Sequence, residues 1–366
     1  MKIAMDVSII EQCRTGTEEY VEGLIWGLSR LGTGVVGVGR RGQALLPDQP
    51  CLGLASRPKR PLWEKLWWEN VSIIKTPQDV DLLHIPYMMY PPVALSIPTV
   101  VTVHDVIPYR LSAYHARWKE RLYFGQIRKY LPHASQIVAI SRATAQDIAE
   151  LFPELTARVT VIPNGVHPDF FRPVPVEQME RLSSRYRPVR HPRLLYIGGY
   201  DPRKNVSTLL KACQQVFARH TGGELVLIGA ETDLTIQHQI ADLHLQERVV
   251  TTPYLTRQEV VALYQTADLF VFPSTYEGFG MPPAQALAMG VPVVAGSTPA
   301  VSEVVGDSGL LVPPQDVDAW VQTVNKVLDT PALAQKMAAR GRARAEDFNW
   351  ETVARQYDRL YQRLVP

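Results

Sequence analysis

Short apolar runs alternate with helix-like patterns from one end of the chain to the other, and this alternation constrains the fold more than any other feature. Between the runs, residues such as Tyr20, Leu24 and Leu28 recur every three or four positions and mark one face of a helix. Regular alternation of strands and helices predicts parallel sheets covered by helices on both faces, an α/β fold. We expect strands at Ile3–Ile10, Gly34–Gly39, Pro98–Val103, Ile137–Ile140, Val159–Ile162, Leu194–Gly198, Leu225–Gly229, Leu269–Pro273 and Pro292–Ala295.

A proline-rich stretch divides the chain near its middle. Residues 172–192 hold four prolines and show no hydrophobic period, which is typical of a linker. A length of 366 residues is enough for two domains. We expect an N-terminal domain over 1–170, a second domain over 171–345, and a C-terminal helix within 346–366.

Composition and charge exclude several classes of protein. With 46% hydrophobic residues and a net charge of +2, the chain is neither disordered nor a typical nucleic-acid binder. It holds no run of 18 apolar residues, so we expect no transmembrane helix. Three scattered cysteines do not form a disulfide framework. We expect a cytoplasmic protein.

The segment 274–292 carries the strongest functional signal. After the expected strand 269–273 come Glu277, Gly278, Phe279 and Gly280, and then two prolines that suit the first turn of a helix. Glycines let backbone N–H groups approach a ligand, and a helix N-terminus attracts a diphosphate. An ordinary strand-to-helix turn with a solvated Glu277 is the alternative.

A second strand-to-helix loop has the same character. Gly199 follows the expected strand 194–198, Arg203 and Lys204 follow the glycine, and Asn205 is placed to cap the next helix. Two cations at a helix start can hold a diphosphate. The alternative is a solvated pair of basic residues.

Two positions in the first half also invite a functional interpretation. Gly16 lies between Thr15 and Glu18, which fit a capping box, so this glycine serves either a turn or a ligand. His104 ends the expected strand 98–103, where α/β sheets place residues that contact ligands. A structural hydrogen bond is the alternative for this histidine.

Together these segments resemble glycosyltransferase family 4, the retaining group 1 glycosyl transferases of GT-B fold. The similarity rests on Gly16, His104-Asp105, 199–205, 277–292, Asn164-Gly165-Val166 and Phe348-Asn349-Trp350. It implies two Rossmann-like domains that face a cleft, with the last helix returning to the first domain. It also implies that the second domain binds a nucleotide-sugar donor.

The resemblance further implies roles for individual residues. Glu277 would hold the transferred sugar, and His104 would contact that sugar from the first domain. Gly16 would let its loop close over the phosphates. The remaining donor contacts would come from Gly199, Arg203, Lys204, Gly278, Phe279 and Gly280.

One position departs from the family pattern. The family has a second glutamate eight residues after the first, and this chain has Gln285 there. In the family that glutamate binds the ribose. A glutamine keeps an acceptor oxygen and gains an amide donor, but it loses the strength of a charged hydrogen bond. We expect Gln285 to bind the ribose.

We therefore expect a retaining glycosyltransferase that moves a mannose- or glucose-type sugar from a GDP- or UDP-linked donor to a hydroxyl of a glycan or lipid-linked acceptor. We expect no metal and no cofactor besides the donor, since cations and helix termini already surround the diphosphate. Asp79-Val-Asp81 and Asp316-Val-Asp318 resemble metal-binding pairs, but the second pair suits a helix start. A catalytically decayed nucleotide-sugar-binding protein and a nucleotide-sugar epimerase remain alternatives.

Residues 57–68 combine basic residues with three tryptophans. Tryptophans that face the core are the favoured interpretation, and weak contact of the first domain with the inner face of a membrane is a second. The resemblance implies a third, in which this segment borders the acceptor.

Overall fold

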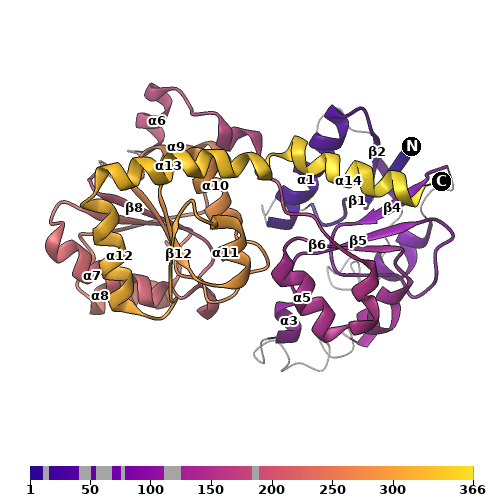
Figure 1. Ribbon diagram of the computed structural model, residues 1–366, viewed down its shortest axis with the longest axis horizontal. Coiled ribbons are helices and arrows are strands. Elements are labelled where there is room, and N and C mark those ends of the chain that lie inside the picture. Colours follow the sequence, from indigo (N-terminus) through magenta and orange to yellow (C-terminus); the bar gives the residue numbers. More distant parts are fainter. Residues whose placement is uncertain are drawn as a thin grey trace. The chain divides into compact units, whose positions relative to one another are not determined.

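The computed structural model describes residues 1–10, 16–40, 51–54, 68–75, 79–110, 125–183 and 189–365 (Figure 1). Thr15 of the expected capping box and residues 57–67 of the tryptophan-rich segment lie outside these ranges. Contacts between residues divide the chain into two units. Unit 1 comprises Met1–Gly165 together with Trp350–Pro366, and unit 2 comprises Val166–Asn349.

Unit 1 is built on a seven-stranded parallel sheet with the strand order β3-β2-β1-β4-β5-β6-β7. The strands are β1 Lys2–Asp6, β2 Gly34–Arg40, β3 Cys51–Leu54, β4 Leu82–Ile85, β5 Thr99–Val103, β6 Gln136–Ala139 and β7 Val159–Val161. Its helices include α1 Gly16–Arg30, α3 Ile107–Arg110, α5 Arg142–Leu151 and α14 Trp350–Leu364. Shorter helical turns lie at Trp68–Ser72, Ile73–Lys75, Leu131–His133 and Pro153–Arg158.

The two faces of this sheet carry separate cores, because side chains alternate along each strand. Ile3 and Met5 of β1 pack with α1 and α14 on one face, and Ala4 packs on the other face with Trp68 and Ile148. Trp68 is buried and donates its indole N–H to Asp6 Oδ2 at 3.1 Å. The core interpretation of this tryptophan is therefore confirmed.

Helix α14 belongs to unit 1, although 184 residues of unit 2 separate it from the rest of that unit. Its buried residues follow the helical period: Trp350, Val353, Ala354, Tyr357, Leu360 and Tyr361. It lies along α1 in Figure 1, where it is the yellow helix at the C-terminus. The expected return of the last helix to the first domain is confirmed.

Glycines allow α1 and α14 to approach closely. A Cβ added to Gly23 would lie 1.9 Å from the indole nitrogen of Trp350, and one added to Gly27 would lie 2.7 Å from the Ala354 Cβ. Gly165, the last residue before the chain enters unit 2, also packs against the Trp350 ring. A Cβ added to Gly165 would lie 2.2 Å from the Cδ2 atom of that ring.

Unit 2 is built on a six-stranded parallel sheet with the order β10-β9-β8-β11-β12-β13. The strands are β8 Arg193–Ile197, β9 Glu224–Ile228, β10 Val249–Thr252, β11 Leu269–Phe272, β12 Val293–Gly296 and β13 Leu310–Val312. The helices are α6 Val176–Ser183, α7 Val206–Arg219, α8 Leu234–Asp242, α9 Arg257–Gln265, α10 Met281–Met289, α11 Pro299–Val305, α12 Val317–Leu328 and α13 Pro331–Ala345. Single turns of 3-10 helix lie at Pro168–Phe171, Pro202–Lys204 and Glu346–Phe348.

The α/β prediction is confirmed, and each of the nine expected strands forms within a few residues of its expected bounds. Strands β3, β4, β10 and β13 were not expected. The sequence placed domain boundaries after residues 170 and 345, whereas contacts place the unit boundaries after Gly165 and Asn349. Val166 N–H donates to the Phe348 carbonyl at 2.7 Å, which ties the first residue of unit 2 to the end of that unit.

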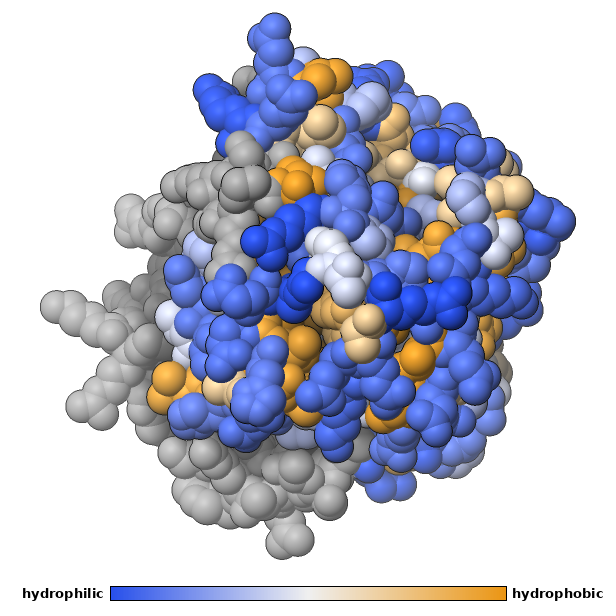
Figure 2. All heavy atoms as spheres, turned by 90° about the vertical axis from the view of Figure 1, so that its left-hand side faces the viewer, coloured by the Kyte–Doolittle hydropathy of each residue, from blue (hydrophilic) through white to orange (hydrophobic). Residues whose placement is uncertain are grey.

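The face of the molecule in Figure 2 is mostly hydrophilic, and its coloured hydrophobic residues lie in small separate groups. In the described part of the chain, no helix is both long enough and apolar enough to cross a bilayer.

Candidate functional site

The topology of unit 2 brings two of the predicted loops together. Strands β8 and β11 are neighbours, but the chain leaves β8 toward β9 and leaves β11 toward β12, on opposite sides. Such a switch point opens a crevice at the carboxyl ends of the strands. The loops that follow β8 and β11 meet there: Thr275 donates its backbone N–H and its hydroxyl to the Arg203 carbonyl, at 2.7 and 2.9 Å.

A cluster of charged side chains occupies this crevice. Lys204 Nζ donates to Glu277 Oε1 at 2.6 Å, and Arg203 Nη1 donates to Glu277 Oε2 at 3.2 Å. The side chains of Lys204 and Glu277 are only 12% and 11% exposed. Ser274 is fully buried and donates its hydroxyl to Glu277 Oε1 at 2.6 Å. Glu277 is therefore not a solvated surface residue, since three donors fix its carboxylate.

Local turns hold the two cations in place. Asp201 caps the 3-10 turn Pro202–Lys204 by accepting the Arg203 N–H at 3.1 Å, and its carboxylate lies 3.6 Å from Arg203 Nε. Lys204 Nζ also lies over the Phe272 ring, 5.4 Å from its centroid. An ammonium has three donors, and Glu277 accepts one of those of Lys204.

Asn205 serves a different purpose from the one expected. It stands at the N-cap position of α7, but its side chain makes no capping hydrogen bond. Its amide instead donates to the carbonyls of Pro273 and Pro314, at 3.2 and 2.6 Å. With φ at +55°, Asn205 adopts the left-handed conformation that asparagine tolerates. The residue joins the two crevice loops rather than capping the helix.

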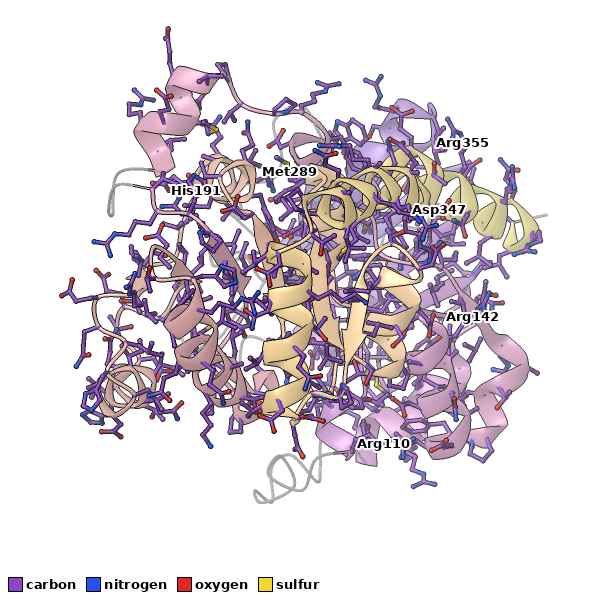
Figure 3. All side chains as sticks on the ribbon, turned by 60° about the vertical axis from the view of Figure 1, so that its left-hand side comes forward. Arg110, Arg142, His191, Met289, Asp347 and Arg355 are labelled. Carbon is purple, nitrogen blue, oxygen red and sulfur yellow. The ribbon has the colours of Figure 1, made fainter. Side chains whose placement is uncertain are left out.

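The start of α10 offers fewer backbone donors than the sequence analysis assumed. Gly280 is the N-cap residue with φ at +112°, a conformation that favours glycine. Pro282 and Pro283 follow in the first turn and have no N–H to donate. The amide of Met281 is therefore the first-turn donor that a diphosphate can use, together with those of the preceding loop. Figure 3 labels Met289, the last residue of this helix.

The side chain of Phe279 is structural. It is 5% exposed and packs edge-to-face against Phe348, with ring centroids 5.5 Å apart. The ring is therefore engaged in packing within unit 2.

Gln285 is buried under the crevice, with 5% of its surface exposed. Its Oε1 lies 3.5 Å from the hydroxyl of Tyr264, which also donates to the Pro282 carbonyl at 2.9 Å. A buried amide avoids the large desolvation cost of a buried carboxylate. This gives a physical reason for glutamine at a position where the family has glutamate.

Gly16 and Gly199 stand where a larger side chain would also fit. An added Cβ at either position, as at Gly125, would meet no atom of the described residues within 4 Å, and neither has a positive φ. Internal packing therefore does not require glycine at these two positions. Space for a ligand is a second explanation for these glycines.

In unit 1, His104 lies directly after β5, beside the switch point between β1 and β4. Its Nε2 donates to the Pro86 carbonyl at 2.8 Å, and none of the described residues bonds Nδ1. Burial lowers the pKa of His104 to about 4. The imidazole is therefore neutral at pH 7, and its Nδ1 can accept a hydrogen bond from a hydroxyl.

Ser274, Asp201 and Tyr264 contact the predicted residues and were not predicted from the sequence. Ser274 and Asp201 lie inside the quoted motifs, so proximity could have suggested them. Tyr264 lies 21 residues before Gln285, and no sequence signal connects the two.

The paired aspartates are explained by local structure. Asp316 accepts the Ala319 N–H at 3.0 Å and caps α12. Asp79 pairs with the Lys2 side chain, and Asp81 accepts the Lys2 N–H.

The fold is that of the GT-B glycosyltransferases. Sucrose-phosphate synthase from Thermosynechococcus elongatus superposes with a TM-score of 0.79 at 24% identity, over 99% of this chain and 98% of that one. Anabaena HepE, solved in complex with UDP and glucose, superposes with a TM-score of 0.76 at 19% identity over the full length of both chains.

Sequence comparison identifies the family. Residues 14–170 match Glycosyltransferase Family 4, and residues 182–344 match Glycosyl transferases group 1. O-antigen chain mannosyltransferase B of Escherichia coli is 31% identical over 72% of this chain and 70% of that protein. MMP alpha-(1->4)-mannosyltransferase of Mycolicibacterium hassiacum is 31% identical over 74% of this chain and 66% of that protein. The chain belongs to the group 1 glycosyltransferases.

Proposed function

We propose that this glycosyltransferase acts in glycan or glycolipid synthesis, transferring a mannose- or glucose-type sugar from a UDP- or GDP-linked donor to a hydroxyl acceptor. We propose further that it retains the anomeric configuration and needs no metal. The names of the two mannosyltransferase relatives support the sugar, and the UDP bound to the Anabaena enzyme supports the donor class.

The observation that carries this proposal is the convergence of Arg203, Lys204 and Glu277 at the switch point of unit 2. A departing diphosphate gains negative charge in the transition state, so cations fixed beforehand lower the barrier. The backbone amides of residues 278–281 add donors at the same end of the sheet. Gly199 leaves room for the phosphates on the opposite loop.

Glu277 and His104 are assigned to the sugar. The carboxylate of Glu277 accepts hydrogen bonds from sugar hydroxyls once the diphosphate has drawn the cations toward itself. The neutral His104 accepts another hydroxyl through Nδ1. Gln285 and Tyr264 are assigned to the ribose side of the donor. Gly16 is assigned to the phosphates, as the family resemblance implies, because the described residues leave the space beside it open.

Retention requires either two displacements or departure and attack on the same face of the sugar. Two displacements need a carboxylate placed as nucleophile on the face opposite the leaving group. Glu277 is bound to Lys204, Arg203 and Ser274, and it is assigned to hydroxyl recognition rather than attack. We propose the same-face route.

The test is release of nucleoside diphosphate from UDP-glucose, UDP-N-acetylglucosamine, GDP-mannose and GDP-glucose, with mannosides and glucosides as acceptors. We expect one donor to be turned over at full rate in excess EDTA, with an α-linked product seen by NMR from these α-linked donors. Donor binding without turnover would support a decayed protein, and conversion of donor without acceptor would support an epimerase. Loss of activity in EDTA with rescue by Mn²⁺ would overturn the metal-independent part.

Substitution of Lys204, a cation assigned to the diphosphate, gives a second test. Lys204→Ala is expected to raise the barrier by about 2–4 kcal/mol, the scale for removal of an electrostatic donor. Lys211→Ala removes an exposed lysine from α7 and should leave turnover unchanged. Equal turnover of the two variants would contradict the assignment.

A further inference from the structure

A network of buried polar side chains lies between the sheet of unit 1 and the helices that cover it. It comprises Tyr20 of α1, His84 of β4, Thr102 of β5, and Tyr357 and Tyr361 of α14, each 1% exposed or less. None of these residues was assigned to the proposed reaction. Five polar side chains are far more than this core needs, since apolar residues of similar size would fill the same space.

The hydrogen bonds of this network can be satisfied in one continuous direction. Burial lowers the pKa of His84 to about 3, so this histidine is neutral and carries one N–H. Tyr361 can donate to His84 Nδ1 at 2.6 Å, and His84 Nε2 can then donate to the Thr102 hydroxyl at 2.8 Å. Thr102 in turn can donate to Tyr20 at 2.9 Å, and Tyr20 donates to Tyr357 at 2.8 Å. A chain of donors fixed at every step holds the Tyr20 hydroxyl in one place.

The ring of Tyr20 connects this network to His104. The two rings meet edge-to-face, with centroids 4.8 Å apart and an angle of 85° between their planes. The Pro86 carbonyl accepts from Nε2 of the same imidazole. The imidazole is thus held at one nitrogen by a hydrogen bond and on the ring by Tyr20, while Nδ1 stays available.

Tyr20 also lies one helical turn after Gly16, the first residue of α1. The same short helix therefore carries a glycine with room for a ligand and the aromatic ring that contacts His104. A movement of α1 would change both positions together.

We propose that Tyr20 is a positioning residue for His104, and that its hydroxyl is anchored by Thr102 and by Tyr357 of the C-terminal helix for this purpose. The consequence for catalysis rests on the proposed function, in which His104 accepts a sugar hydroxyl. The consequence for the imidazole does not, because it concerns the protein without ligand.

The first experiment measures the imidazole directly. Long-range ¹H–¹⁵N spectra of histidine-labelled protein report the tautomer of each ring, and the His104→Gln variant identifies the His104 signals. We expect the Nε2–H tautomer in the wild type. Tyr20→Leu removes the ring and is expected to shift the His104 signals toward an average of both tautomers. Tyr130→Phe, a matched change at a tyrosine of unit 1 that lies beside His133 and outside the network, should leave them unmoved.

The second experiment is a double-mutant cycle on donor turnover, with the nucleotide sugar that the turnover assay selects. We expect Tyr20→Leu to lower kcat at least tenfold in the wild-type background and less than twofold in a His104→Gln background. Tyr20→Phe keeps the ring and loses the anchor, so a loss of about threefold is expected. Tyr130→Phe, outside the network, should retain kcat within twofold.

Two results would overturn the proposal: unchanged His104 signals in Tyr20→Leu, or equal losses of kcat in both backgrounds, which would mark Tyr20 as a core residue only. If Tyr20→Leu does not fold, the spectra and the cycle are decided with Tyr20→Phe. Absence of turnover in the wild type would contradict the proposed function, whereas the spectra would still decide the role of Tyr20.

Discussion

Glu277 binds the same two cations that are proposed to bind the donor diphosphate. Its carboxylate accepts from both Lys204 and Arg203, so the two cations proposed to bind a diphosphate are paired with Glu277. An incoming diphosphate must share these cations with Glu277, and the two anions repel each other at short range. Glu277 is therefore expected to promote transfer of the sugar and to weaken binding of the nucleotide alone.

This competition predicts opposite effects of one substitution. Glu277→Gln is expected to lower turnover about a hundredfold, because a charged contact to the sugar is lost. It should also tighten binding of UDP or GDP about fivefold, roughly 1 kcal/mol, because an anion next to the diphosphate is removed. Calorimetric titration with the nucleotide measures the second effect. Asp318→Asn on α12 changes the net charge by the same amount and should alter neither turnover nor nucleotide affinity. Weaker nucleotide binding in Glu277→Gln would refute the competition.

Gln285 is expected to affect binding rather than chemistry. The ribose takes no part in bond breaking, so a contact to it is about equally strong in the ground and transition states. Gln285→Ala should then raise KM for the donor about fivefold, near the 1 kcal/mol of a typical hydrogen bond, and leave kcat nearly unchanged. Tyr264→Phe removes the hydroxyl beside Oε1 and should act in the same direction. A fall in kcat with unchanged KM would show that Gln285 has another role.

Part of this site could be predicted from sequence because glycines, cations and Glu277 lie in contiguous motifs after strands. The topology then brings the loops together, as expected for a parallel sheet. The pairing of Glu277 with both cations depends on side-chain directions that no spacing encodes. The buried state of Gln285 likewise depends on Tyr264, which reaches it from another helix.

At the scale of elements, the close contact between α1 and α14 depends on two glycines four residues apart. Gly23 and Gly27 lie on one face of α1, and the Trp350 ring occupies the space where the Gly23 side chain would be. Sequence periodicity identified the apolar face of α1 and predicted the C-terminal helix. It did not identify this stripe as a contact surface, because a glycine adds nothing to a hydrophobic pattern.

Gly23→Ala tests that contact. In an unconstrained helix the change would stabilise by nearly 1 kcal/mol. Here the added methyl overlaps the indole, and we expect a net loss of about 1–3 kcal/mol in the free energy of unfolding, the usual cost of overpacking. Urea unfolding measures it, with the exposed Ser29→Ala on the same helix as the control, expected to change by less than about 0.5 kcal/mol. A more stable Gly23→Ala protein would refute the close contact.

The strands show where sequence patterns are informative. The nine expected strands are apolar runs bounded by turn residues. Strand β4 was missed because His84 interrupts Leu82-Leu83-His84-Ile85, although the structure buries all four residues. The hydrogen bonds that satisfy this histidine come from β5 and α14, far away in sequence.

At the scale of the whole molecule, buried neutral histidines predict how stability depends on pH. Burial lowers the pKa of His84 to about 3, and that of His104 and His167 to about 4. Between these values and 6.5 the unfolded chain binds protons that the folded chain does not, so the free energy of unfolding falls as the pH is lowered. Burial raises the pKa of Asp6, which opposes the trend at the acidic end.

Each fully shifted histidine contributes up to about 1.4 kcal/mol per pH unit in this window. We expect stability near pH 7 to change little, and then to drop steeply between pH 6 and 4.5. Urea unfolding at half-unit intervals measures the slope. His104→Gln removes one titrating group and should make the slope shallower, independently of its effect at pH 7. A flat profile from pH 7 to 4.5 would contradict the buried neutral state.

The division of unit 1 between the two ends of the sequence has a consequence for biosynthesis. A ribosome delivers Met1–Gly165 first, but the surface of α1 that receives Trp350 stays uncovered until unit 2 has been translated. Unit 2, in contrast, is one uninterrupted segment and has all its residues before α14 emerges. The half that comes first from the ribosome is therefore the half completed last, and nascent chains stalled before residue 350 would expose the glycine stripe to chaperones.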